Sequence, residues 1–275
     1  MRETGREAVS DDVMASLLSL GERRLRQRIA EDRIWPLRLP WIMSQRWGHL
    51  LYLHYRVGSD ELQGLVPEPL GVDEFEGSAW VSVIPLLMMN VHLRDLMPIP
   101  GAATFPEINV RTYVVYDNVP GVFFLSIDAA SRMATFIARS SFRLPYHAAT
   151  MSIEHVAGEF HHMSVRPQDA SARFEAIYHP TGRAVPTDSG SLERFLAERY
   201  CMYAIGRSGR LLRGDISHLP WAVESVEATI HRNDLLEVNG VTPLAEPIMS
   251  YSVGSDSYCW PVRSASVPQR IWPRR

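Results

Sequence analysis

The sequence predicts a mainly β fold of the α+β kind, in which a curved antiparallel β-barrel-like domain carries a few peripheral helices. From Trp41 onward, short apolar runs alternate with polar residues at period two, and Pro and Gly separate the runs. Few segments of this region have helical spacing, and strands and helices do not alternate as they do in a parallel sheet. These observations favour one antiparallel barrel or sandwich-like domain.

The N-terminal segment, residues 1–40, predicts a helical extension. Ser10, Asp11 and Asp12 are typical of a helix start, and apolar residues then recur at helical spacing until Pro36. We interpret this segment as a surface helix that packs on the main domain or on a partner. Binding to a membrane surface or to nucleic acid is the weaker alternative, because acidic residues share the helix. Residues 41–275 are then a single β-rich domain.

Within this domain, alternation and turn residues predict the elements in order. Strands are expected at Leu50–Val57, Ala79–Met89, Asn109–Tyr116, Val122–Asp128, His147–Val165 and Ala172–Tyr178. Helical spacing predicts helices at Asp60–Val66, Ala129–Phe142 and Leu192–Tyr200. We expect Asp128 to cap the second helix and the Asp188–Ser191 turn to cap the third. Turns are expected at Asn118–Gly121, Arg166–Ser171, Arg207–Arg210 and Asn239–Gly240, the last two in hairpins.

All 28 basic residues are arginine, so the chain contains no lysine. A Schiff-base enzyme needs a side-chain amine, whereas the only primary amine here is the α-amino group of Met1. Class I aldolases, pyridoxal phosphate enzymes and lysine-dependent decarboxylases are thereby excluded as normally built. P-loop nucleotidases and protein kinases are excluded for the same reason, because each places a lysine on phosphate groups.

Charge and composition limit the expected partners. A net charge of −3 gives no overall attraction to nucleic acid, and the longest apolar run, Ala79–Met89, is too short to span a membrane. Cys201 and Cys259 form no CxxC pattern, and the N-terminus has no signal-peptide pattern. We therefore expect reduced thiols in a cytoplasmic protein that binds neither nucleic acid nor membrane. A homo-oligomer is left open.

The strand that contains Glu107–Tyr113 is the most informative run. Residues two apart on a strand share a face, so one face carries a carboxylate, an amide, a guanidinium and a phenol, from Glu107, Asn109, Arg111 and Tyr113. In a barrel this face would be a polar wall on which arginine could bind a carboxylate. An internal pair of Glu107 and Arg111 on a solvated face is the alternative. On the expected partner strand, the same spacing places Phe124, Ser126 and Asp128 on one face.

Two further segments supply candidate site residues. Arg199 would point inward beneath apolar side chains, where Glu198, Glu107 or a ligand anion could pair with it. His218 lies in a predicted loop with Trp221, a plausible pocket lip, and is the best general acid–base candidate by residue type. A structural ion pair and a surface histidine are the respective alternatives.

Metal and nucleophile chemistry have little support. His155, Glu159 and His161 share one face of the predicted strand His147–Val165, but roughly 20 Å would separate the two histidines, too far to share an ion. The sequence has no GxSxG motif, no cysteine beside a histidine and no dinucleotide fingerprint. We expect no metal and no cofactor.

Several short motifs together resemble the YqjF-like family, a domain of unknown function assigned to the acetoacetate decarboxylase-like fold. They occur in order as Gln45–Trp47, Leu53–Tyr55, Phe75–Trp80, Glu107–Tyr113, Phe124–Ala129, Leu144–Tyr146, Leu192–Tyr200 and His218–Trp221. The resemblance spans roughly Trp41–Val262. It implies a strongly curved, mostly antiparallel β structure that encloses a ligand cavity, but it brings no activity, because the family is uncharacterised.

Better-known relatives of this fold use a Schiff base, with the amine in a Gly-Phe-Pro-Lys-Lys-like segment just after a helix. The comparable stretch here is similar in position and reads Arg143-Leu-Pro-Tyr-His147. The resemblance therefore implies that the cavity is kept and the covalent chemistry is lost, with Tyr146 and His147 where lysines would be expected.

These observations support two hypotheses. In the first, an enzyme acts noncovalently on a small carboxylate or enolate, as a lyase, isomerase or cyclase. Arg111 and Asn109 would bind the anion, Tyr113 and Tyr146 would stabilise an oxyanion, and His147 or His218 would move the proton. In the second, the same cavity belongs to a noncatalytic binding protein. A scaffold that acts through the N-terminal helix is a weaker third.

Overall fold

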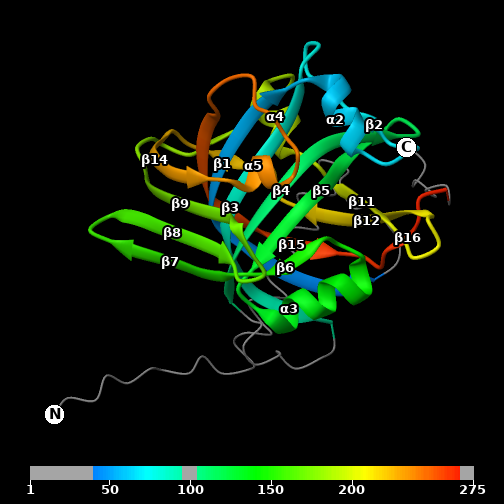
Figure 1. Cartoon of the computed structure of the whole chain (residues 1–275), viewed down its shortest axis with the longest axis horizontal. Coiled ribbons are helices and arrows are strands. Elements are labelled where there is room, and N and C mark those ends of the chain that lie inside the picture. The colour runs from blue at the N-terminus through cyan, green and yellow to red at the C-terminus, as the bar shows by residue number, and fades with distance from the viewer. Residues whose placement is uncertain (1–39, 95–103, 267–275) are drawn as a thin grey trace. The chain divides into compact units, whose positions relative to one another are not determined.

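The computed structural model describes residues 40–94 and 104–266, and the ribbon is drawn in Figure 1. The helix predicted before Pro36 lies outside these residues.

One ten-stranded, strongly curved sheet forms the centre of the fold. Its long strands are β1 (Met43–Val57), β3 (Ala79–Leu93), β4 (Phe105–Tyr116), β5 (Val119–Ala129), β11 (Cys201–Ile205), β12 (Leu211–His218) and β15 (Ile248–Cys259). β4 pairs with both β3 and β5, so the path β4-β3-β1-β15-β12-β11-β5 returns to its start. All its neighbouring strands are antiparallel except β11–β5 and β5–β6. The prediction of a mainly β, curved antiparallel domain is confirmed.

Smaller elements complete the described part of the chain. The short strands of the main sheet are β2 (Gly71–Val72), β6 (Tyr146–Ala148) and β16 (Arg263–Ser264). A second sheet contains β7 (Thr150–Val156), β8 (Glu159–Arg166), β9 (Asp169–Pro180) and β14 (Val226–Asn233), and a two-stranded one pairs β10 (Val185–Pro186) with β13 (Ala222–Val223). The helices are α2 (Ser59–Leu65), α3 (Arg132–Ile137) with its π-helical continuation η1 (Ala138–Phe142), α4 (Leu192–Ala197) and α5 (Leu235–Val238).

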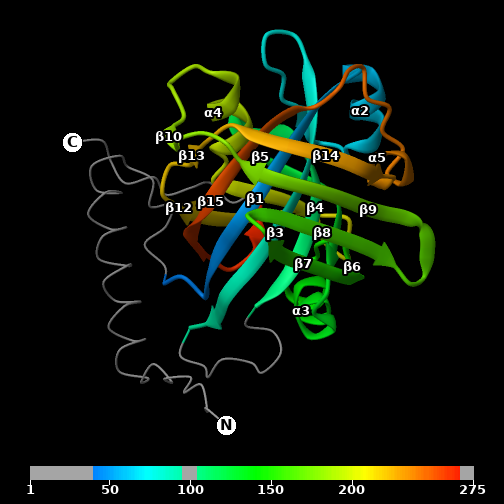
Figure 2. The ribbon, with the colours of Figure 1, turned by 90° about the vertical axis from the view of Figure 1, so that its left-hand side faces the viewer.

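The two faces of the main sheet have different partners. The outer face of β1, β3 and β4 packs against the four-stranded sheet, which Figure 2 shows in front of these strands. Leu53, Val83 and Val110 meet Phe174 and Tyr178 in this core. The inner face of the same strands surrounds a cavity that α3 and η1 help to line. Alternation along each strand therefore sends one set of side chains to a packed core and the other to the cavity.

Five of the six predicted strands lie within strands of the structure. The helix predicted at 60–66 agrees with α2 to within one residue, and the Arg207–Arg210 turn joins the antiparallel strands β11 and β12, as predicted. The prediction of one strand over His147–Val165 is wrong, because a turn at Ala157 and Gly158 divides β7 from β8. Both residues have positive φ, as a two-residue hairpin turn of type I′ requires. The turn at Asn239–Gly240 follows helix α5 and joins no hairpin, because β14 pairs with β9.

The helix predicted over Ala129–Phe142 begins later, and Asp128 does not cap it. Ser131 is the cap, since its hydroxyl accepts a hydrogen bond from the backbone N–H of Ala134. Asp128 instead accepts a hydrogen bond from the Arg166 Nε at 2.7 Å and is 1% exposed. The pair joins β5 to β8 and so ties the main sheet to the second sheet.

A bulge in β5 changes which of its residues face the cavity. Val110 lies opposite Ser126, but Arg111 lies opposite Phe124, so Leu125 is an extra residue on this strand. Phe124 and Ile127 consequently line the cavity, whereas Ser126 bonds to Asn239 on the outer side. The expectation that Phe124, Ser126 and Asp128 share a face is wrong for this reason.

The close pairing of β1 and β15 depends on a glycine at position 254, which lies opposite Gly48. Gly254 has φ +120°, and a Cβ atom built on it would lie 1.9 Å from the Trp47 carbonyl oxygen.

We expect Gly254→Ala to lower the free energy of unfolding by more than about 3 kcal/mol, because the backbone of Trp47 and Gly48 must move. Gly77, with φ +73° and no atom within 4 Å of the added Cβ, is the control. Gly77→Ala should cost only about 1–2 kcal/mol, from its backbone conformation. Urea unfolding of both variants measures the difference, and equal losses would contradict the steric argument.

Candidate ligand-binding cavity

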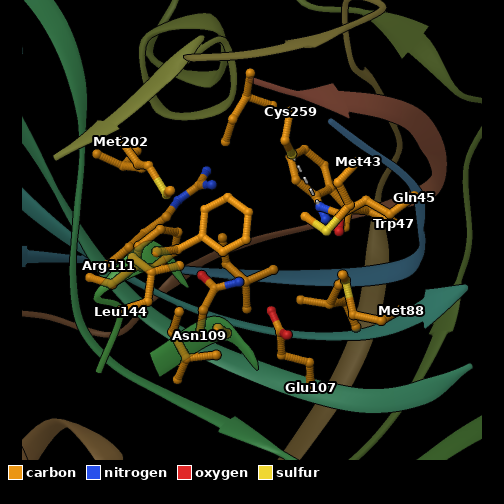
Figure 3. A pocket seen from close by; sticks show the side chains of 18 of the residues that line it. Met43, Gln45, Trp47, Met88, Glu107, Asn109, Arg111, Leu144, Met202 and Cys259 are labelled. Atoms are coloured by element: carbon orange, nitrogen blue, oxygen red, sulfur yellow. Dashed lines mark hydrogen bonds between the residues drawn. The ribbon is translucent and has the colours of Figure 1, made fainter. Parts of the chain in front are cut away.

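The curved sheet encloses a cavity of about 150 Å³, a size comparable to cavities that admit a benzene ring. Most of its wall is apolar. The apolar lining comes from several strands and from η1 and includes Met43, Leu50, Ile84, Leu86, Met88, Phe105, Phe124, Ile127, Phe142, Leu144 and Met202. Figure 3 shows this pocket with the side chains that project into it.

Three polar side chains of the mainly apolar wall come from β4. Glu107, Asn109 and Arg111 follow one another at two-residue spacing, and their polar ends point into the pocket (Figure 3). Arg111 donates one hydrogen bond from Nη2 to the Leu196 carbonyl oxygen at 2.9 Å. Its Nε and the Oδ1 of Asn109 are both buried, and neither has a hydrogen-bond partner among the described residues. A buried donor and acceptor without partners are costly, so a ligand that satisfied both would be favoured.

Glu107 is 5% exposed, and its carboxyl group is the acidic group of the cavity wall. Tyr146 on β6 donates a hydrogen bond from its hydroxyl to Oε2 of Glu107 at 2.8 Å. Burial raises the pKa of Glu107 to about 7. The hydrogen bond from Tyr146 lowers this pKa, and the negative charge of Asp128 raises it. Burial and the nearby Glu107 raise the pKa of Tyr146 well above its usual value. Glu107 can therefore hold or release a proton near neutrality, while Tyr146 stays protonated.

Tyr113 occupies the same face of β4 but lies beyond the lining residues of the cavity. Its hydroxyl lies 2.6 Å from the Ser82 hydroxyl, which in turn lies 2.6 Å from Nδ1 of His54. Burial and the charge of Arg111 lower the pKa of His54 to about 3. This histidine is neutral at physiological pH, so the hydrogen-bonded series His54, Ser82 and Tyr113 adds no charge near Arg111.

His218 and Trp221 are buried, not exposed in a surface loop. His218 ends β12, and Trp221 stacks on Trp47 with ring centroids 5.8 Å apart. Both ring nitrogens of His218 lie near backbone carbonyl oxygens, 2.8 Å from Leu219 and 3.3 Å from Arg199. Burial lowers the pKa of His218, and Glu198 opposes that shift.

Glu198 and Arg199 follow α4, because this helix ends at Ala197. Glu198 does not line the cavity; its carboxylate accepts hydrogen bonds from the Trp221 backbone N–H and the Tyr200 hydroxyl. Arg199 lines the cavity with part of its side chain, but its guanidinium pairs with Asp73 at 2.5 Å. The expected partners of Arg199 were Glu198, Glu107 or a ligand, so the structure corrects this assignment.

His147 does not face the cavity. Tyr146 and His147 are neighbours on β6, so they point to opposite sides. Tyr146 reaches Glu107 inside, whereas His147 lines a separate hollow on the outside together with arginines. The expectation that both would act in one cavity is wrong for this geometric reason.

Sequence reasoning missed several cavity residues. Gln45, Trp47, Cys201 and Cys259 all line the cavity, and burial raises the pKa of the two thiols to about 11 and 12, respectively. Extending the period-two pattern upstream of Leu50 would not have found Gln45 and Trp47, because the strand is irregular at His49, which has positive φ, and the residues that face the cavity change from odd to even numbers there. The cysteines are free, as predicted.

The histidines of β7 and β8 lie on two strands of one hairpin. Glu154 lies opposite His161, so His155 and His161 are closer than one continuous strand would place them. Within residues 40–94 and 104–266, no group of three potential ligands is arranged to hold a metal ion. None of the described helices is long and apolar enough to cross a membrane.

Comparison with solved structures assigns the architecture to the acetoacetate decarboxylase-like fold. The enduracididine biosynthesis enzyme MppR complexed with pyruvate matches with a TM-score of 0.61 over 84% of this chain and 93% of its own, at 14% identity. Acetoacetate decarboxylase from Legionella pneumophila matches with a TM-score of 0.57 over 86% of this chain and 96% of its own, at 12% identity. Identities this low show the fold alone.

The chain itself belongs to the DUF2071 family, described as an uncharacterized conserved protein, whose model matches residues 44–256. One relative of this chain is the uncharacterized protein YqjF of Bacillus subtilis (strain 168). It is 39% identical over 227 residues, which cover 82% of this chain and 93% of YqjF. The resemblance to the YqjF-like family is therefore confirmed.

The raised pKa of Glu107 predicts a specific pH dependence of stability. Between pH 4.5 and about 7 the unfolded chain ionises this carboxyl group and the native protein does not, so the free energy of unfolding falls as pH rises. The predicted loss from Glu107 is about 3 kcal/mol. We expect Glu107→Gln to remove this part of the slope and to become relatively more stable than wild type toward pH 7.5.

Urea unfolding at pH 5 and pH 7.5 measures this effect. The control is Glu193→Gln, which alters an exposed carboxylate on α4 and should leave the wild-type pH dependence unchanged. Parallel pH profiles for Glu107→Gln and wild type would show that Glu107 is ionised in the native protein across this range.

Proposed function

We propose that this protein is a cytoplasmic enzyme that binds a small carboxylate or enolate in its cavity and catalyses noncovalent proton transfer. The observation that carries the proposal is the position of Glu107, a carboxyl group with a pKa of about 7, on the same strand face as a donor and an acceptor that have no hydrogen-bond partner among the described residues. A general acid–base catalyst is most effective when its pKa lies near the working pH.

Arg111 and Asn109 would recognise the ligand. The free Nε–H of Arg111 supplies a donor for a carboxylate or enolate oxygen, and Asn109 supplies an acceptor for a hydroxyl or enol proton. Apolar walls remove water and strengthen these interactions. That MppR has been seen with pyruvate, on the same fold, supports a small oxo acid as the ligand class.

Glu107 would move the proton. As a carboxylate it would take a proton from the carbon next to a ligand carbonyl, so the C–H bond breaks and the electron pair passes to the carbonyl oxygen. Arg111 would stabilise the resulting enolate, and Tyr146 would hold Glu107 in place. Protonation at another carbon gives isomerisation, and loss or attack of a neighbouring group gives lyase or cyclase chemistry. No amine is needed.

The remaining candidates take supporting roles in this proposal. His218 directs both ring nitrogens at carbonyl oxygens, which suits a wall residue better than a proton carrier. Trp221 closes the wall beside it, and Glu198 fixes the Trp221 backbone. Tyr113 would act through Ser82 and Arg111 and not on the ligand.

Deuterium exchange tests the proposal directly. Wild-type protein in D₂O at pH 7 is mixed with pyruvate, 2-oxobutanoate or phenylpyruvate, and ¹H NMR follows loss of the proton next to the carbonyl. We expect exchange above the protein-free rate with at least one of these acids. Glu107→Gln should slow it by about 100-fold or more, and Tyr146→Phe by about tenfold, because they remove the base and its hydrogen bond.

Glu193→Gln is the matched control and should exchange at the wild-type rate. Native mass spectrometry of the purified protein adds a binding measurement. Bound oxo acid without exchange in the wild type would favour the alternative, a noncatalytic binding protein. Equal exchange by wild type and Glu107→Gln would refute the role of Glu107.

A further inference from the structure

A second hollow lies on the outer side of the segment that follows η1. Tyr146 and Leu144 line both this hollow and the cavity, so one stretch of chain separates the two. The charged or titratable residues of the outer hollow are Arg139, Arg143, His147 and Arg207. Arg139 lies in η1, Arg143 directly follows it, His147 lies in β6, and Arg207 lies in the turn between β11 and β12.

The hollow is basic, although Asp169, which is not among its lining residues, acts electrostatically on His147. No carboxylate is among its lining residues, and none of its three arginine side chains forms a described ion pair or hydrogen bond. Other arginines of the fold do have such partners: Arg166 pairs with Asp128, Arg199 with Asp73 and Arg213 with Asp215. Three unpaired guanidinium groups around one hollow repel each other, so an anion between them would be favoured.

An apolar hollow adjoins the basic one. The two share Arg143, Pro145 and Ile205, and the second is lined further by Phe123 and Tyr203 among other apolar groups. The surface therefore offers positive charge at one end and aromatic and aliphatic contact at the other. A ligand that matches both ends has an anionic group attached to an apolar body.

We propose that Arg139, Arg143, Arg207 and His147 bind the phosphate group of a small phosphate ester, whose organic part lies in the adjoining apolar hollow. Guanidinium groups bind phosphate oxygens through paired, charge-assisted hydrogen bonds. A phosphate monoester has three terminal oxygens and close to two negative charges at pH 7, which suits three arginines better than a single carboxylate does. This site is separate from the cavity and does not depend on the function proposed for it.

His147 provides a readout inside the proposed site. It is half-buried, and Arg139 and Arg166 lower its pKa in addition to burial, while Asp169 opposes them. A bound phosphate would add negative charge beside the imidazole and raise its pKa by about one unit. The ¹H–¹³C signal of its Cε1–H group, assigned with His147→Gln, reports both the pKa and the binding.

The experiment titrates the full-length protein with inorganic phosphate and with phenyl phosphate, with chloride holding the ionic strength constant. We expect a saturable shift of the His147 signal with both probes and tighter binding of phenyl phosphate. The double variant Arg143→Gly with Arg207→Ala should weaken binding of phenyl phosphate by about tenfold or more. Glycine is used at position 143 because this residue has φ 58°, which glycine adopts without strain.

Arg183→Ala is the control for loss of surface charge, because Arg183 is exposed and lines neither hollow. It should bind both probes as wild type does, and circular dichroism confirms that each variant is folded. The proposal is overturned if neither probe gives a saturable shift, or if the double variant binds like Arg183→Ala. Equal affinity for the two probes would overturn the assignment to an ester.

Discussion

The burial of the Glu107 carboxyl group is the interaction on which the rest of the site depends. A carboxylate in an apolar cavity must be paired with a cation or take up a proton. Arg111 lies on the same strand, but its described hydrogen bond goes to the Leu196 carbonyl, and Arg199 is held by Asp73. Glu107 is left with a neutral phenol, Tyr146, so protonation near pH 7 is the outcome. In a chain without lysine, Glu107 supplies the cavity with a carboxyl group whose pKa lies near neutrality.

The sheet can bury this carboxyl group because one of its faces packs in the core and the other lines the cavity. Ile108 and Val110 fill the core between the sheets, so the polar residues that alternate with them can face an open cavity without loss of that core. The same alternation made the face of Glu107, Asn109 and Arg111 predictable from the sequence. It failed on β5, because the bulge at Leu125 inserts one residue and reverses the faces of everything after it. No local signal in Phe124–Asp128 marks that insertion.

Side-chain pairs between residues far apart in the sequence could not be predicted either, because they depend on how the sheet closes. Arg199 lies 126 residues from Asp73 in the sequence, and Asp128 lies 38 residues from Arg166. Residue type and spacing indicated that Arg199 needed an anion but not which one. His218 was recognisable as a reactive residue type, yet its contacts with the carbonyl oxygens of Leu219 and Arg199 depend on the positions of β12 and of the segment after α4. Fold class and local elements follow from periodicity, whereas such pairs follow from the closure of the sheet.

The pair Tyr146 and His147 shows how one short strand presents side chains to two separate hollows. Adjacent strand residues point to opposite sides, so β6 presents a phenol to the cavity and an imidazole to the basic hollow. Its parallel pairing with Ile127, Asp128 and Ala129 fixes it beside the strand that also carries the ion pair to Arg166. A shift of β6 by one residue would exchange the two side chains and leave Glu107 without its hydrogen bond. The register of β6 is therefore what keeps the chemistry of the cavity apart from the positive charge outside it.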